Sequence, residues 1–388
     1  MYDLILKNGL VADGSRAKPY RADVCIQNGC VAKITRQLDE TANTVLDVAG
    51  LVVAPGFIDI HSHSDACPLV DYPVESKLYQ GITTEITGNC GISILPNTPE
   101  GWRSNQEYFF NQLELPTGDL SLEGLYDLND YSSAVTAHGC IGNYGQLIGH
   151  GTLRGAVMGF VDRDPTPEEM ERLKALLRRE LEAGLIYPPS SFCKTEELVE
   201  LAKVLKEYDA LLTVHMRSEG PRVFQAVDEM LEITRRSGVH LQISHLKLMG
   251  KPQWGRADEL LAKIQAARDE GLTITCDQYP YTATSTSMTA LLPHWAHDGG
   301  VPALIQRLKE PTQKLKDETG EEMENRGGPA SILVSSTHGY HPEWEGKTVE
   351  QLSQEFQMDP VDTVIQVLEQ CDSSVACIYF CINEADML

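Results

Sequence analysis

Short apolar runs alternate with amphipathic segments through the middle of this chain. The apolar runs have the length and composition of β-strands, and they lie at residues 56–61, 82–87, 139–144, 211–215, 241–245 and 272–277. Helical patterns separate them, and two of these begin at the capping residues Thr166 and Thr195. Strands that alternate with helices are typical of a parallel sheet built from βα units. We therefore predict an α/β domain, a parallel (β/α) barrel, over residues 55–285.

The first 54 residues have a different pattern, in which short strands are separated by turn residues. The runs LIL and LVAD flank Asn8-Gly9, and the runs VCIQ and CVAKIT flank Asn28-Gly29. Asn-Gly between two such runs predicts a tight β-hairpin. Residues 1–54 are therefore predicted to form part of a small β-sandwich domain that is too short to be stable alone.

The regular alternation ends near residue 285. Residues 286–347 are polar, with a strongly charged stretch, and predict an irregular insertion rather than another βα unit. Two helical patterns and the apolar run VACIYF follow in residues 348–388. This last segment is predicted to return to the barrel.

Composition narrows the class of protein. The chain has 388 residues and a formal net charge of −24, which disfavours nucleic acid or an anionic membrane as a partner. No secretory signal is visible, and no apolar stretch reaches the roughly 18 residues that a membrane helix needs. The ten cysteines are scattered along the chain and are expected to be reduced. A cytoplasmic protein is the expectation.

Histidine and cysteine side chains follow the ends of several predicted strands. His61 and His63 end the run in APGFIDIHSHSD, Cys90 follows the next run, and His215 and His245 close two later ones. Each alone has a structural alternative, such as a hydrogen-bonded core histidine or a small buried cysteine. Together they favour a metal site, because the carboxyl ends of parallel barrel strands meet on one face. Imidazole and thiolate are the usual ligands of Zn²⁺.

Several blocks of the sequence resemble a known family. PGFIDIHSHSD is similar to the opening motif of the amidohydrolase superfamily. GITTEITGNCGIS, LIGHGTLRGAVMG, TVHMRSEG, ISHLK and DQYPYTATST resemble the N-acyl-D-amino-acid deacylase (D-aminoacylase) family, over residues 50–290 and more weakly towards both ends. The resemblance implies a (β/α)8 TIM-type barrel. It also implies zinc-dependent hydrolysis of N-acyl-D-amino acids to a carboxylate and a free D-amino acid.

The resemblance also implies roles for the metal-ligating residues. Cys90, His215 and His245 would hold a tightly bound zinc, and His61 and His63 would form a weaker second metal position. Three protein ligands leave a fourth tetrahedral position open for water, whose pKa zinc lowers towards about 7. The resulting hydroxide would attack the amide carbonyl.

A carboxylate-bearing small-molecule substrate requires cationic and hydroxyl groups near the metal. Lys247 and Arg217 each lie two residues beyond a predicted ligand and would point to the same side of a continuing strand. Tyr279 and Tyr281 follow the last predicted strand of this region. The structural alternatives are surface cations and rim aromatics. We predict that all four bind substrate.

Two departures from the family pattern predict an incomplete barrel. Only Leu185–Tyr187 precede two prolines where the family has its fourth strand, and proline cannot donate to a strand ladder. The catalytic aspartate of the family lies at the tip of the eighth strand, which would fall beyond Leu388. We therefore expect a truncated chain that lacks the eighth strand and is catalytically impaired.

Two other functions remain open. A cyclic-amide hydrolase, such as a D-hydantoinase or dihydroorotase, typically bridges its metals with a carboxylated lysine. Cys90 and the lack of a suitable lysine at a strand end argue against it. The second alternative is a non-catalytic remnant that binds metal without turnover.

Overall fold

The computed structural model describes residues 1–70, 76–113, 120–182 and 193–388. The shortened fourth strand that we predict at Leu185–Tyr187 lies outside these residues. Among the described residues, no helix is both long and apolar enough to cross a membrane.

Two compact units make up the chain. The first combines Met1–Asp59 with Glu75–Thr84, and the second combines Ile60–Val74 with Glu85–Leu388. All the predicted site residues belong to the second unit.

The first unit contains a five-stranded sheet in the order β3-β2-β1-β4, with β5 paired to β1. Its strands are β1 (Tyr2–Val11), β2 (Tyr20–Gln27), β3 (Cys30–Thr35), β4 (Ala42–Asp47) and β5 (Val52–Val53). β4 and β5 run parallel to β1, whereas β2 is antiparallel to both β1 and β3. Val11, Ala22 and Val24 form its small apolar core. The short strand β6 (Phe57–Asp59) also belongs to this unit.

The two Asn-Gly sequences have different roles. Asn28 and Gly29 have left-handed φ angles of 53° and 73°, and they form the predicted hairpin turn between β2 and β3. The hairpin predicted at Asn8-Gly9 is wrong, because β1 continues through both residues. Asn8 lies instead in a β-bulge just before Gly9, where its N–H donates to Asp23 Oδ1 at 2.8 Å.

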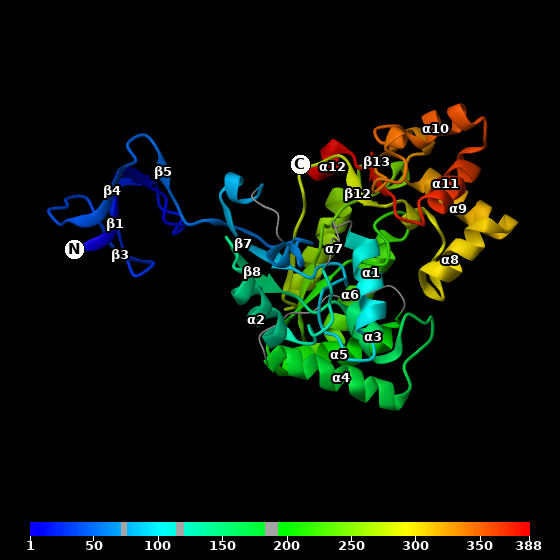
Figure 1. Ribbon diagram of the computed structural model, residues 1–388, viewed down its shortest axis with the longest axis horizontal. Coiled ribbons are helices and arrows are strands. Elements are labelled where there is room, and N and C mark those ends of the chain that lie inside the picture. The colour runs from blue at the N-terminus through cyan, green and yellow to red at the C-terminus, as the bar shows by residue number, and fades with distance from the viewer. Residues whose placement is uncertain (71–75, 114–119, 183–192) are drawn as a thin grey trace. The chain divides into compact units, whose positions relative to one another are not determined.

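The second unit contains a parallel sheet in the order β11-β10-β9. Its strands are β9 (Leu211–Val214), β10 (His240–Ile243) and β11 (Ile274–Cys276), which confirm three of the predicted runs. The helices α5 (Thr195–Glu207), α6 (Val223–Ser237) and α7 (Ala257–Asp269) pack against these strands (Figure 1). Leu205, Leu212, Val227 and Leu241 belong to the apolar core between the helices and the sheet. The alternation of strand and helix therefore predicted this part of the fold correctly.

Two further predicted strands lie earlier in the chain. β7 (Ile82–Thr87) spans the whole predicted run, and it pairs with β8 (Asn143–Gln146). β8 begins later than the run predicted at 139–144. The first residues of that run are rich in glycine and do not join the strand ladder. The predicted run at 56–61 is shorter too, since only Phe57–Asp59 is a strand.

Four helices lie between residues 102 and 182 in the described part of the chain. They are α1 (Trp102–Leu113), α2 (Leu128–His138), α3 (His150–Met158) and α4 (Pro167–Glu182). α4 begins at the predicted capping box, in which Thr166 Oγ1 accepts from Glu169 N at 3.2 Å and Glu169 Oε2 accepts from Thr166 N at 2.8 Å. Short 3-10 helices complete the chain: η1 (Cys67–Leu69), η2 (Leu78–Gln80), η3 (Lys251–Gln253), η4 (Met288–Leu291), η5 (His294–His297), η6 (Pro329–Ser331) and η7 (Pro342–Trp344).

Residues 286–347 are not irregular, contrary to the prediction. They contain α8 (Gly300–Lys309), α9 (Gln313–Asn325) and β13 (Ile332–Ser336). The helical pattern of α9 is hard to recognise in the charged stretch because the helix buries few side chains. These are Leu315, Thr319 and Met323, which lie four residues apart on one helix face.

The last helices and strands of the chain belong to the same region as α8, α9 and β13. α10 (Val349–Phe356) and α11 (Pro360–Gln370) confirm the two helical patterns, and α12 (Glu384–Met387) ends the chain. β14 (Ala376–Tyr379) confirms the final apolar run, and it lies between β12 (Thr284–Ser287) and β13 in an antiparallel sheet. Within the described residues the strands form separate sheets, so a closed barrel remains a prediction.

Candidate metal centre

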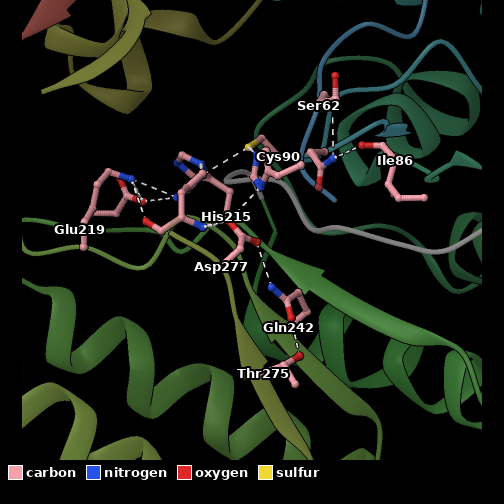
Figure 2. Close-up of polar contacts among 12 residues, drawn as sticks. Ser62, Ile86, Cys90, His215, Glu219, Gln242, Thr275 and Asp277 are labelled. Carbon is pink, nitrogen blue, oxygen red and sulfur yellow. Dashed lines mark hydrogen bonds and ion pairs between the residues drawn. The ribbon is translucent and has the colours of Figure 1, made fainter. Parts of the chain in front are cut away.

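The candidate centre lies at the carboxyl ends of the parallel sheet. His215 follows β9, His245 follows β10 after one residue, and Asp277 follows β11 directly. Figure 2 shows Cys90, His215, Glu219 and Asp277 gathered at one end of these strands. Since parallel strands end at the same edge, residues far apart in the sequence converge here.

Two other predicted zinc ligands lie close to the Nε2 atom of His245. Cys90 Sγ lies 3.3 Å from it and His215 Nδ1 lies 2.8 Å from it. His61 joins from the other side, with Nε2 at 3.4 Å from Cys90 Sγ, so that the ligand atoms of His61, Cys90 and His245 all lie within 4.8 Å of one another. His63 is the neighbour of His61, with ring centroids 5.5 Å apart. The structure therefore brings His61, Cys90, His215 and His245 together, and His63 lies next to them through its ring contact with His61.

Two of these residues have left-handed backbones that hydrogen bonds to carboxylates support. Cys90 and His245 have left-handed φ angles of 58° and 39°, which are uncommon outside glycine and cluster at functional sites. The buried Asp65 accepts from Gly88 N at 3.1 Å and thereby fixes the turn that carries Cys90. Asp277 Oδ1 accepts from His245 N at 2.7 Å. The left-handed positions are thus supported by hydrogen bonds to carboxylates.

Glu219 and Asp277 are carboxylates of the candidate centre that were not predicted from the sequence. Glu219 Oε1 lies 2.6 Å from His245 Nδ1, and Asp277 Oδ1 lies 3.3 Å from His61 Nδ1. Metal-binding histidines commonly donate their second ring N–H to a carboxylate in this way. One signal was available for Asp277, which ends a predicted strand just as the two histidines do.

The acid–base properties of the cluster suit a cation. Part of the His215 side chain is open to solvent, yet desolvation by the surrounding protein, with neighbouring His245, lowers the pKa of His215 to about 3. Desolvation also lowers the pKa of His245. Both imidazoles are therefore neutral at pH 7 and can donate a lone pair. Burial raises the pKa of the Cys90 thiol, so its thiolate requires a nearby positive charge.

Lys247 and Tyr279 lie beside the cluster. Lys247 is 6% exposed, and its Nζ contacts Glu219 Oε1 and lies 3.0 Å from His245 Nδ1. Its Nζ is also 5.4 Å from the centroid of the half-buried Tyr279 ring. The Tyr281 ring lies 6.4 Å from that of Tyr279 and is 67% exposed. The structure thus places the Tyr279 ring beside Lys247, and Tyr281 next to Tyr279.

Arg217 has a different environment. Its Nε lies 2.8 Å from Glu229 Oε2, and its Nη2 donates to the Cys193 carbonyl. These contacts tie the end of β9 to α6, and a role of the Arg217 guanidinium in substrate binding stays a prediction.

The sequence matches the model of the Amidohydrolase family over residues 44–263. It is 36% identical over 301 residues to the D-aminoacylase of Alcaligenes xylosoxydans xylosoxydans, which covers 74% of this chain. It is 37% identical over 291 residues to the N-acyl-D-glutamate deacylase of the same organism, which covers 73% of this chain. The chain belongs to the D-aminoacylase family of amidohydrolases. The family inferred from the sequence blocks is therefore confirmed.

Solved structures show the same relationship. An N-acyl-D-glutamate deacylase from Bordetella bronchiseptica, complexed with zinc and a phosphonate inhibitor, has a TM-score of 0.79 and 28% identity. A D-aminoacylase mutant in complex with copper chloride has a TM-score of 0.78 and 30% identity. Each alignment covers 100% of this chain and 73% of the other. The chain spans 59% of the length of the D-aminoacylase and 58% of the N-acyl-D-glutamate deacylase from Alcaligenes.

Proposed function

We propose that this chain carries the metal centre of a zinc-dependent hydrolase of N-acyl-D-amino acids. The single observation that carries the proposal is the approach of Cys90 Sγ and His215 Nδ1 to the same nitrogen of His245, in a chain of this family. The reaction adds water across the amide carbon–nitrogen bond and releases a carboxylate and a free D-amino acid. The substrate is therefore a small molecule with one acyl amide and one carboxylate.

The donor set fits zinc. One thiol and several neutral imidazoles are borderline-soft ligands, which zinc prefers, whereas Mg²⁺ and Ca²⁺ prefer oxygen. Cys90, His215 and His245 would hold the tight ion, and His61 and His63 would contribute a weaker second position next to Cys90. When bound, zinc activates water and polarises a carbonyl oxygen.

The other residues of the centre would bind the substrate or orient the metal ligands. Lys247 provides a buried ammonium that would pair with the substrate carboxylate, and the Tyr279 hydroxyl would donate a hydrogen bond nearby. Tyr281, which is exposed next to Tyr279, would contact the outer part of the substrate. Glu219 and Asp277 hold His245 and His61 in the tautomer that leaves the nitrogen on the Cys90 side free for the ion.

Two broader proposals accompany this one. The parallel strands of the second unit would belong to the (β/α)8 barrel of the family, whose active sites lie at the carboxyl ends of the strands. A cytoplasmic location is supported by the ten cysteines, all of which are free thiols in the structure.

Release of amine from N-acetyl-D-methionine tests the proposal. The zinc-loaded chain should release the D-amino acid, even if at the reduced rate expected from the sequence. It should leave the L-enantiomer intact and should not open a hydantoin ring. Opening of the hydantoin ring would favour a cyclic-amide hydrolase instead. About one zinc per chain with no release of amine would contradict the hydrolase and favour a protein that binds metal without turnover.

A further inference from the structure

We infer that Glu219 is a positioning residue that joins the metal ligand His245 and the substrate-binding Lys247 in one buried hydrogen-bonded unit. The inference rests on the proposed function for the roles of those two residues. It adds that the affinity for the metal and the affinity for the substrate carboxylate depend on the same carboxylate oxygen.

The contacts of Glu219 Oε1 carry the inference. This oxygen lies 2.6 Å from His245 Nδ1 and contacts Lys247 Nζ. Lys247 Nζ closes the unit by lying 3.0 Å from His245 Nδ1 and donating to the His245 carbonyl at 3.1 Å. The exposed fractions of Glu219, His245 and Lys247 are 8%, 9% and 6%. Water therefore competes little for these hydrogen bonds.

The geometry of the His245 ring indicates why Glu219 positions rather than ligates. Nδ1 faces Glu219, whereas Nε2 faces Cys90 and His215. A proton on Nδ1, donated to Glu219, leaves the Nε2 lone pair free for an ion. Glu219 Oε1 also accepts from Lys247, so it already has two donors. Although Glu219 lies within 4.8 Å of ligand atoms of His215 and His245, its oxygen is committed to those donors.

Charge makes Glu219 necessary for Lys247 as well. An ammonium that is 6% exposed requires a paired anion, and Glu219 provides it in the structure. Without that anion Lys247 would turn away or draw in another carboxylate. A neutral glutamine at this position would keep the size of the side chain but lose the charge that holds both partners. The imidazole and the ammonium should therefore lose their orientation together.

The experiment compares Glu219→Gln with a matched control, Glu197→Gln. Glu197 is also a buried carboxylate between a histidine and a cation, with Oε1 at 2.7 Å from His150 Nε2 and Oε2 at 2.5 Å from Arg154 Nη1. No sequence or structural argument links Glu197 to the metal. Zinc affinity is measured by competition with a chelator. Binding of D-methionine, which carries the carboxylate but no acyl amide to cleave, to the zinc-loaded full chain is measured by calorimetry.

Glu219→Gln should weaken zinc binding by about 10- to 100-fold, and it should also weaken ligand binding at saturating zinc. Glu197→Gln should lose thermal stability but keep the zinc affinity of the unmodified chain. Glu219→Asp should fold and give an intermediate zinc affinity, which keeps the test open if the glutamine variant does not fold. X-ray absorption at the zinc edge should show the same number and type of ligands in the unmodified chain and in the Glu219 variants.

Three results would overturn the inference. They are an unchanged zinc affinity in the Glu219 variants, an equal loss in Glu197→Gln, and loss of an oxygen ligand from the zinc in Glu219→Gln, which would make Glu219 a ligand. A failure of the proposed function is distinguishable. In that case the unmodified chain would not hydrolyse N-acyl-D-amino acids, while the effect of Glu219 on zinc affinity could still be measured.

Discussion

Cys90 combines an unusual backbone conformation with a thiol that lies close to two histidines. Its backbone is left-handed at φ 58°, and its thiol lies between the rings of His61 and His245. Burial raises the pKa of the thiol, which disfavours a bare thiolate. A bound cation reverses this preference, because a coordinated thiol loses its proton. The proposed role of Cys90 as a metal ligand would account for both the left-handed backbone and the desolvated thiol.

Replacement of this residue gives the prediction at the residue scale. Cys90→Ser should weaken zinc binding by at least 100-fold, because a serine hydroxyl is a poor zinc ligand at neutral pH. Competition with a chelator measures the change. Cys140→Ser removes an exposed thiol and serves as the control, with no change in affinity expected. Equal affinities for the unmodified chain and Cys90→Ser would exclude a ligand role.

The histidines and Cys90 could be predicted from the sequence because each follows a strand, and parallel strands meet at one edge. Glu219 could not, since it lies in a loop four residues beyond His215 and glutamate is common at surfaces. Arg217 looked equally suited to binding substrate, but its partner Glu229 comes from a helix whose position the sequence does not reveal. Contacts between side chains of different helices, strands and loops could not be predicted from the sequence and require the three-dimensional structure.

The turn after β7 is the element that sets the position of Cys90. Helix α3 begins where Gly149 approaches this turn, and a Cβ on Gly149 would lie 2.7 Å from the carbonyl oxygen of Gly91 and 2.8 Å from Ser93 N. No side chain fits at that range without moving the backbone. Gly149 thus allows the helix to support the metal-binding turn directly.

Gly149→Ala should therefore destabilise the protein by about 1–3 kcal/mol and also weaken zinc binding. The control is Gly320→Ala in α9, where the nearest atom to the added Cβ is a flexible Val361 side-chain carbon at 3.3 Å. Chemical unfolding gives the stability, and chelator competition gives the affinity. The account of this turn would be wrong if Gly149→Ala left the zinc affinity unchanged.

At the scale of elements, the sequence predicted strands well where apolar runs were short and bounded by turns. β7, β9 and β10 lie within about two residues of the prediction. It failed for α9, whose amphipathic face contains few apolar residues, and for the Asn8-Gly9 turn, which is a bulge. In both cases contacts with other elements, which are not local in the sequence, decide the structure.

The stability of the whole molecule should respond to acid through His297, a partly buried histidine outside the metal centre. Desolvation, together with the neighbouring His294, lowers the pKa of His297 to about 4. The unfolded chain then binds more protons than the folded chain between about pH 6.5 and 4. The stability linked to His297 is fully present above pH 6.5 and is lost as the pH falls towards 4.

His297→Gln should reduce this loss. The free energy of unfolding, measured in urea at several pH values, should fall less steeply between pH 6.5 and 4 in the variant than in the unmodified chain. The difference between the two slopes isolates His297 from other titrating groups. Parallel slopes would contradict the burial of a neutral imidazole at this position.

Across the whole chain, the proposed function depends on Cys90, His215 and His245 holding one zinc ion. X-ray absorption at the zinc edge of the loaded chain tests it most directly. The account predicts one sulfur ligand at about 2.3 Å and nitrogen ligands at about 2.0–2.1 Å, with the sulfur lost in Cys90→Ser. A zinc ion with only nitrogen and oxygen ligands in the unmodified chain would contradict it.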